Sequence, residues 1–149
     1  MAHYYFAYGS NLWIQQMERR CPSAQLLGTA RLPEHRLTFF GACSGWGEGG
    51  VADGEPSPGQ TLEGVVYRLS EPDLIALDDH EDNYHRVRQE VELTSGWMEV
   101  WTYRKARDEG FTPPAVRYLS AISFGYGQHG FDLATLWQAA GVAPEPHSR

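Results

Sequence analysis

The chain has 149 residues, with 19 acidic against 12 basic side chains and a formal net charge of −7 at pH 7. This charge argues against non-specific binding to nucleic acid or to an anionic membrane surface, because both attract basic proteins. Hydrophobic residues make up 42% of the chain, which is typical of a folded domain. Since no apolar run has the length of a membrane span and no secretory signal is recognisable, we expect a cytoplasmic protein of one domain.

The first informative segment is the apolar run Tyr4–Tyr8, which predicts a strand that ends at Gly9. Glycine has no Cβ, so the backbone can turn there and approach a ligand closely. A helix is predicted from about Leu12 to Arg20, with Ser10 or Asn11 as its cap. The first amides of such a helix can bind a carboxylate or phosphate, although an ordinary capped turn contains the same residue types.

The middle of the chain is predicted to be mostly extended. Strands are expected at residues 24–32, 36–40 and 61–69. The first two are expected to pair through a turn at Pro33–His35. The glycine-rich segment 41–50 predicts a loop with little structure of its own, and segment 53–60, with two prolines and two glycines, predicts a turn-rich connector.

A helix with a well-defined start is predicted after residue 69. Ser70 can cap it, Asp73 can complete a capping box, and Pro72 is tolerated in the first turn. The helix is expected to end between Asp79 and Asp82. Its apolar side is predicted to consist of Leu74, Ile75 and Leu77.

The last third of the chain combines a hairpin with two helices. The predicted elements are strands at 87–93 and 97–104 and helices at 115–124 and 132–140. Alternating apolar and charged residues indicate the first strand, and Ser95–Gly96 predicts the tight turn. Asp132 is the expected cap of the last helix and Gly141 its end. Strands and helices without strict alternation indicate an α+β fold at residues 1–143, followed by a loose tail at 144–149.

The two cysteines, Cys21 and Cys43, are too few and wrongly spaced for a metal-binding framework. The sequence does not decide whether they form a disulfide, although reduced thiols are the rule in the cytoplasm. Neither lies in a recognisable nucleophile motif. We therefore interpret both as structural residues.

Four carboxylates crowd the end of the helix predicted after Ser70, at Asp78, Asp79, Glu81 and Asp82. Neighbouring carboxylates disfavour the ionisation of one another, and the helix dipole favours cations at this end. Local violations of this kind are more common at functional sites. Asp79 and Asp82 nevertheless fit a solvated helix end, and Asp78 fits a local cap or anchor.

A series of motifs follows in order along the chain. They are Tyr-Phe-Ala-Tyr-Gly-Ser-Asn-Leu at 5–12, Arg-x-Pro-Ser-Ala at 20–24, Ala-Arg-Leu at 30–32, Gly-Gly-Val-Ala at 49–52, Pro-Gly at 58–59, Gly-Val-Val-Tyr at 64–67, Leu-Asp-x-x-Glu at 77–81, Pro-Pro-x-x-x-Tyr at 113–118 and Gly125. Over nearly the whole chain this order resembles the gamma-glutamylcyclotransferase family. The resemblance implies a mixed, partly closed β-barrel flanked by helices, a closure that the residue pattern alone does not predict.

The resemblance also implies a reaction and a catalytic residue. In the family, the α-amine of a γ-glutamyl group attacks its own γ-carbonyl, and 5-oxoproline and an amine are released. Glu81 stands where the family has its catalytic glutamate, which acts first as general base and then as general acid. Burial and nearby acids are expected to raise its pKa toward neutrality. The implied reaction requires no metal or redox cofactor.

Further residues are assigned to the site by the same resemblance. The expected substrate-binding residues are Tyr8, Gly9, Ser10, Asn11, Leu12, Tyr84 and Tyr118. The loop amides would bind the substrate α-carboxylate or polarise the γ-carbonyl, and this choice stays open. For Tyr84 and Tyr118, a purely structural role is an equal alternative.

One departure from the family pattern concerns the leaving group. Relatives usually have glycine after the catalytic glutamate and several residues before the tyrosine, whereas here Asp82–Asn83 alone separates Glu81 from Tyr84. The substrate therefore stays open between a γ-glutamyl dipeptide, a γ-glutamylamine and a γ-glutamyl metabolite. The protein is expected to be a monomer or a homodimer.

The sequence also allows three other interpretations. A metal-assisted hydrolase could use His80, Glu81, Asp82 and His85, but their spacing matches no known metal motif. Ser10 could act as a hydrolase nucleophile, but its flanks lack Gly-x-Ser-x-Gly. A non-catalytic module could retain the pocket only to bind a γ-glutamyl ligand.

Overall fold

The computed structural model describes residues 2–41, 43–44, 47–81, 84–105 and 110–142. Its strands are β1 (His3–Ala7), β2 (Gln25–Phe40), β3 (Cys43–Ser44), β4 (Gly47–Glu48), β5 (Val51–Leu69), β6 (Tyr84–Leu93) and β7 (Gly96–Lys105). Its helices are α1 (Ile14–Arg20), α2 (Glu71–His80), α3 (Val116–His129) and α4 (Leu133–Ala140), with a 3-10 turn, η1, at Ser10–Leu12. The predicted tail at 144–149 lies outside the described residues.

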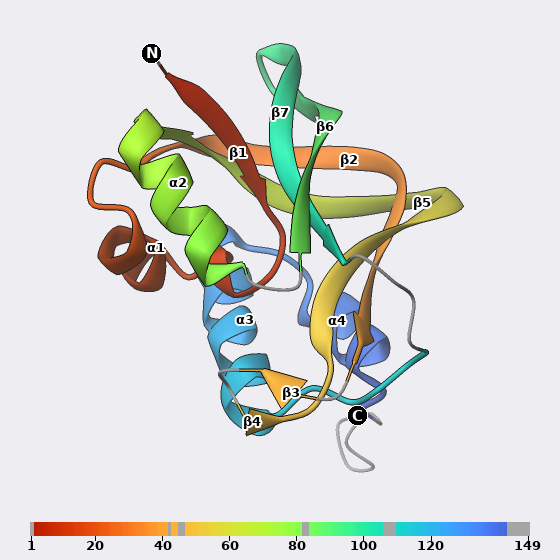
Figure 1. The fold of residues 1–149 in the computed structure, drawn as a ribbon. Coiled ribbons are helices and arrows are strands. Elements are labelled where there is room, and N and C mark those ends of the chain that lie inside the picture. The colour runs from red at the N-terminus through yellow and green to blue at the C-terminus, as the bar shows by residue number, and fades with distance from the viewer. Residues whose placement is uncertain (1, 42, 45–46, 82–83, 106–109, 143–149) are drawn as a thin grey trace.

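Five strands form a closed barrel in the order β1-β5-β2-β6-β7, with the helices packed around it (Figure 1). The parallel contact that closes the barrel joins Tyr5 of β1 to Trp101 of β7. The other pairings are antiparallel. The predicted α+β class and the mixed barrel flanked by helices are confirmed, and the barrel is fully closed.

The two strands predicted at 24–32 and 36–40 are one continuous strand, β2, and do not pair with each other. Both halves pair with β5, and the register shifts between Pro33 and His35. Glu34 between them has a φ of 63°, the mark of a bulge rather than of a hairpin turn. Proline is tolerated at such an irregularity, so the predicted turn is a bend within a strand.

The turn-rich connector predicted at 53–60 is also wrong, because these residues belong to β5. Prolines and glycines here occupy the far part of a long two-stranded ribbon with β2, which bends away from the barrel toward α4 (Figure 1). In the predicted loop at 41–50, β3 and β4 form a short antiparallel pair, and Ala42, Gly45 and Trp46 lie outside the described residues. The structure therefore has more strand than the composition suggests.

The first helix starts later than predicted. Residues 10–12 form the 3-10 turn η1, and α1 begins at Ile14 with Trp13 as its N-cap. Neither Ser10 nor Asn11 caps the helix, because the 3-10 turn moves its start beyond their reach. Leu12 and Met17 are fully buried.

Helix α2 has the predicted cap but only half of the capping box. The Ser70 hydroxyl accepts a hydrogen bond from the Asp73 amide. The Asp73 carboxylate does not accept the Ser70 amide hydrogen, as a complete capping box requires, but accepts a hydrogen bond from the Ser23 amide at 2.6 Å. The Ser70 amide donates instead to Ser23 Oγ at 3.2 Å. Ile75, expected to be buried, is 58% exposed, since it lies on the outer side of a helix that buries Leu74 and Leu77.

The end of the chain follows the prediction with small shifts. Strands β6 and β7 pair as a hairpin, but the turn lies at Thr94–Ser95, one residue earlier than expected. Helix α3 continues past residue 124 to His129. Asp132 caps α4 by accepting a hydrogen bond from the Ala134 amide, and Gly141 ends it with a φ of 74°.

Helix α3 packs directly against η1 because it carries a glycine at the contact. A Cβ added at Gly125 would lie 2.4 Å from the Leu12 Cβ and 2.8 Å from the Trp13 amide nitrogen. Leu12 is fully buried below this contact. Gly125 therefore determines how closely the loop after β1 sits on the helix.

The Gly125→Ala substitution should lower the free energy of unfolding by about 1–3 kcal/mol, because the new methyl group meets backbone atoms. Gly127→Ala is the matched control on the same helix, since nothing lies within 4 Å of its added Cβ. It should raise stability by about 0.5–1 kcal/mol. Urea denaturation of both variants checks this, and equal effects would contradict the close packing.

Candidate active site

Glu81 is the C-cap residue that directly follows α2, in the short connection to β6. Its amide donates to the carbonyl oxygens of Leu77 at 3.0 Å and Asp78 at 3.2 Å, and its carbonyl accepts from the Tyr84 amide at 3.1 Å. Leu77 is fully buried. The backbone of Glu81 is thereby held between the helix and the strand.

The Glu81 side chain meets the loop after β1. The Asn11 carboxamide nitrogen, Nδ2, donates to Glu81 Oε1 at 3.3 Å and to the Tyr5 hydroxyl at 3.1 Å. Asn11 is 3% exposed. A loop and a helix end that are far apart in the sequence are thus joined by a direct contact between two predicted site residues.

The orientation of the Asn11 carboxamide follows from its other contacts. Its oxygen, Oδ1, accepts hydrogen bonds from Gln16 Nε2 at 3.0 Å and Arg20 Nη1 at 3.1 Å. An arginine can only donate, so the carboxamide oxygen must face Arg20. The NH₂ group is therefore directed at Glu81. The Asn11 carbonyl also accepts from the Tyr67 hydroxyl at 2.9 Å.

Burial raises the pKa of Glu81 from 4.5 to about 7. The Arg20 charge opposes this rise, and the neighbouring Asp78 carboxylate adds to it. A carboxyl group with a pKa near neutrality can take up a proton and release it again at physiological pH. The predicted direction of the pKa shift is confirmed.

Tyr84 and Tyr118 meet at the backbone of Ala52. The Ala52 amide donates to the Tyr118 hydroxyl at 2.9 Å, and the Tyr84 hydroxyl donates to the Ala52 carbonyl. The two hydroxyls also share a hydrogen bond, and burial raises the pKa of both. A Cβ added at Gly9 would lie 3.7 Å from the Tyr118 oxygen. Both tyrosines therefore stay protonated, and Tyr118 lies against the loop.

The remaining predicted site residues support the loop from within. The Tyr8 hydroxyl donates to the Tyr103 carbonyl at 2.6 Å. The Leu12 amide donates to the Gly9 carbonyl at 3.0 Å, so it is already engaged. Ser10 Oγ accepts from Gln16 Nε2 at 2.8 Å, so its described partner is an amide rather than the histidine that a serine nucleophile would need.

The other acids near Glu81 have separate roles. Asp78 accepts from the Tyr103 hydroxyl at 2.6 Å and pairs with Arg86 at 2.9 Å, which confirms its predicted anchoring. Asp79 is exposed, as expected for a solvated helix end, and Asp82 lies outside the described residues. In the described part of the chain, His, Cys, Asp and Glu side chains form no group of three that could hold a metal ion.

Comparison with known proteins assigns a family to this arrangement. The family model "Gamma-glutamyl cyclotransferase, AIG2-like" matches residues 5–120. The chain belongs to this family. It is 32% identical over 137 residues to gamma-glutamylcyclotransferase of Bos taurus, covering 87% of this chain and 72% of that protein. It is 29% identical over 152 residues to the Homo sapiens protein of the same name, covering 97% and 80%.

A solved structure named gamma-glutamyl cyclotransferase shares the fold, with a TM-score of 0.84 and 27% identity, covering 100% of this chain and 92% of that one. The resemblance found in the sequence motifs is therefore confirmed. None of the helices in the described residues has the length and apolar character needed to span a bilayer.

Three residues of this family member's site were missed by the sequence analysis. Tyr5, Gln16 and Arg20 hold the Asn11 carboxamide, and they do so through side-chain contacts that no sequence spacing reveals. Gln16 carried no such signal in the sequence, because its burial is visible only in the structure. It precedes the buried Met17 in a short helix and is itself 4% exposed, and a buried polar side chain requires partners.

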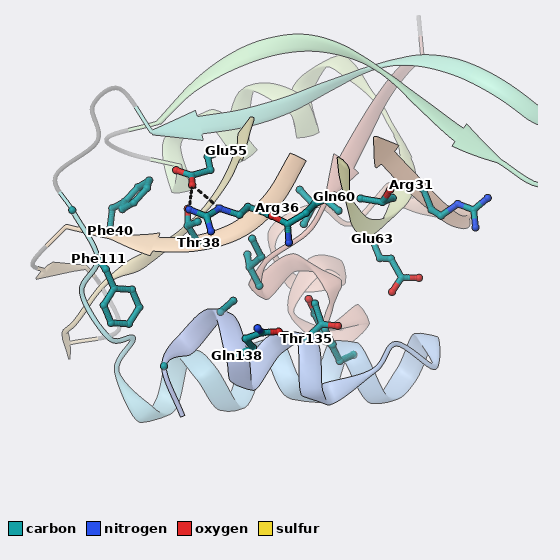
Figure 2. A pocket seen from close by; sticks show the side chains of 17 residues that line it. Arg31, Arg36, Thr38, Phe40, Glu55, Gln60, Glu63, Phe111, Thr135 and Gln138 are labelled. Carbon is teal, nitrogen blue, oxygen red and sulfur yellow. Dashed lines mark hydrogen bonds and ion pairs between the residues drawn. The ribbon is translucent and has the colours of Figure 1, made fainter. Parts of the chain in front are cut away.

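A groove of about 910 Å³ lies elsewhere, between the β2–β5 ribbon and α4 (Figure 2). Its described lining includes neither Glu81 nor any residue of the loop after β1. Figure 2 shows Arg36 and Glu55 directed at each other there, and they hydrogen-bond at 2.7 Å. The charges in this groove are thus partly satisfied within the protein.

The raised pKa of Glu81 should make its contribution to stability depend on pH. Because the folded state holds the Glu81 proton more tightly than the unfolded state, stability is lost as pH rises from about 4.5 to about 7. Relative to the wild type, Glu81→Gln should therefore gain about 1–3 kcal/mol more at pH 8 than at pH 4.

Urea denaturation at both pH values measures this difference, with Asp79→Asn as the control on an exposed neighbour. A stability gain that does not change between pH 4 and pH 8 would contradict the raised pKa.

Proposed function

We propose that the protein is a gamma-glutamylcyclotransferase in which Glu81 is the general base and acid. The observation that carries this proposal is the contact between Glu81 and Asn11, which directs a carboxyl group of raised pKa at the loop after β1. Membership of the family supports the reaction type. The residue roles and the direction of proton transfer are part of the proposal.

The reaction forms one bond and breaks one bond. Glu81 removes a proton from the substrate α-ammonium, and the freed amine attacks the γ-carbonyl carbon to close a five-membered ring. The bond from that carbon to the leaving nitrogen then breaks. The α-nitrogen loses two protons in all and the leaving nitrogen gains two, so Glu81 passes them one at a time and ends ionised as it began. The products are 5-oxoproline and the leaving amine or amino acid, with its amino group in the protonated ammonium form.

The geometry of the loop suits the second requirement of the reaction, which is to hold the γ-glutamyl group curled. The first amides of a helical turn have no partner within that turn, and Ser10 and Asn11 occupy the start of η1. In this proposal their amides bind an oxygen of the substrate, as an oxyanion site does. The nucleophile is already attached to its target, so positioning supplies a large share of the rate.

The paired tyrosines form the opposite side of the proposed site. Tyr84 and Tyr118 are kept protonated by burial and are joined to the loop through Ala52 and Gly9. Neither therefore carries a negative charge, and the Tyr84 proton is already donated to the Ala52 carbonyl oxygen. Their proposed role is to orient the substrate, and Glu81 alone transfers protons.

Replacement of Glu81 by glutamine should lower kcat by about a hundredfold or more, the usual scale for the loss of a general acid–base residue. Release of 5-oxoproline from a panel of γ-glutamyl amino acids and γ-glutamylamines, followed by mass spectrometry, measures this. In the wild type, kcat/KM should rise with pH through about 7 as Glu81 ionises. Near-normal turnover in a folded Glu81→Gln variant would exclude the assigned role.

Replacement of Ser10 by proline should raise KM by about tenfold, because it removes a loop amide that the proposal assigns to the substrate. Ser10→Ala is the matched control: it also loses the hydrogen bond from Gln16 to Ser10 Oγ but keeps the amide. Steady-state kinetics of both folded variants provide the test. If the two variants have the same KM, the loop amides do not bind the substrate.

A further inference from the structure

Arg20 differs from the other described arginines in its surroundings. Five of them pair with carboxylates: Arg31, Arg36, Arg86, Arg88 and Arg104. Three more are exposed: Arg19, Arg68 and Arg117. Arg20 is half-buried, and no carboxylate of the described residues lies within ion-pair distance of it. A partly desolvated cation with no ion-pair partner among the described carboxylates is unusual, and more so in a protein with a net charge of −7.

The position of Arg20 places this charge beside the proposed reaction. Its Nη1 donates to Asn11 Oδ1 at 3.1 Å, and Nδ2 of the same carboxamide donates to Glu81 at 3.3 Å. A guanidinium group has five N–H donors, and the contact with Asn11 is the hydrogen bond it makes to the described residues. Within the described part of the chain, its other N–H groups make no hydrogen bond and can serve a ligand.

The charge of the proposed substrate class matches such a cation. A γ-glutamyl compound carries an α-carboxylate, and a γ-glutamyl amino acid carries a second carboxylate on its leaving group. The negative protein and the Glu81 carboxyl both repel these groups. The planar guanidinium fork matches a carboxylate with two parallel hydrogen bonds, a geometry that lysine does not provide.

We propose that Arg20 binds a carboxylate of the γ-glutamyl substrate. This inference rests on the proposed function and assigns a specificity-determining residue to it. The carboxylate comes either from the glutamyl unit or from the leaving amino acid. If Arg20 binds the carboxylate of the leaving amino acid, the enzyme prefers γ-glutamyl amino acids to γ-glutamylamines.

The electrostatics of the site agree with this position. The Arg20 charge lowers the pKa of Glu81 against the larger effect of burial, and it also acts to lower the pKa of Tyr118 across the loop. The field of Arg20 thus reaches both proposed sides of the site. A bound carboxylate would lie within the same field.

The test compares two substrates and three variants. The substrates are the γ-glutamyl amino acid that the wild-type protein cleaves fastest and the γ-glutamylamine that differs from it only by lacking that amino acid's carboxyl group. The variants are Arg20→Gln, Arg20→Lys and, as the matched control, Arg19→Gln on the exposed side of the same helix, where Arg19 stacks on Trp13. Circular dichroism and thermal unfolding check that each variant is folded.

Arg20→Gln should raise KM about tenfold or more for at least one substrate while kcat changes less than threefold. Arg20→Lys, which keeps the charge but not the fork, should show a smaller rise, and Arg19→Gln should match the wild type. A rise for both substrates assigns the glutamyl α-carboxylate to Arg20. A rise for the γ-glutamyl amino acid alone assigns the carboxylate of the leaving group.

Two results would overturn the proposal in distinguishable ways. If the wild type releases 5-oxoproline and Arg20→Gln has an unchanged KM, with or without a lower kcat, Arg20 acts only by holding Asn11. If the wild type releases no 5-oxoproline from any γ-glutamyl compound, the proposed function itself fails and the role of Arg20 fails with it.

Discussion

The proposed site depends on one hydrogen bond, from the Asn11 carboxamide to the Glu81 carboxyl group. It joins the loop after β1 to the end of α2, and its direction is set from behind by Gln16 and Arg20. Both are donors, so the carboxamide cannot turn its oxygen toward Glu81. Helix α1, through Gln16 and Arg20, thereby orients the contact to the residue on which the proposed chemistry rests. Tyr5, in the strand whose contact with β7 closes the barrel, accepts the second Nδ2 hydrogen bond.

Function and stability oppose each other at Glu81. Burial that raises its pKa to about 7 makes the carboxyl group useful for proton transfer and unfavourable to ionise. The surrounding architecture offsets this locally, with Asp78 anchored by Arg86 and Tyr103 rather than left beside Glu81 as a free second charge. Close packing at Gly125 also keeps the loop in place, together with the hydrogen bond between His129 Nε2 of α3 and the Leu12 carbonyl oxygen at 2.8 Å. The unfavourable burial of the Glu81 carboxyl group is therefore offset by ordinary packing and hydrogen bonds around it.

Local signals in the sequence predicted local structure well and long-range structure poorly. The Ser70 cap and the Gly141 helix end depend on neighbouring residues and were predicted correctly. Pro33 was misread because a bulge and a hairpin turn use the same residue types, and only the pairing with β5 distinguishes them. Barrel closure and the position of Glu81 came from family motifs rather than from periodicity. Arg20 was part of such a motif, but its contact with Asn11 is a tertiary feature that spacing does not encode.

A crystal structure with bound 5-oxoproline tests the central claim most directly, because the product retains the ring, the carboxylate and the nitrogen on which Glu81 is proposed to act. The account predicts that the ring nitrogen lies within hydrogen-bond distance of the Glu81 carboxyl group, with Asn11 still donating to that carboxyl. Product bound away from the loop after β1, for example in the groove beside α4, would contradict it. So would a Glu81 side chain turned away from both Asn11 and the product.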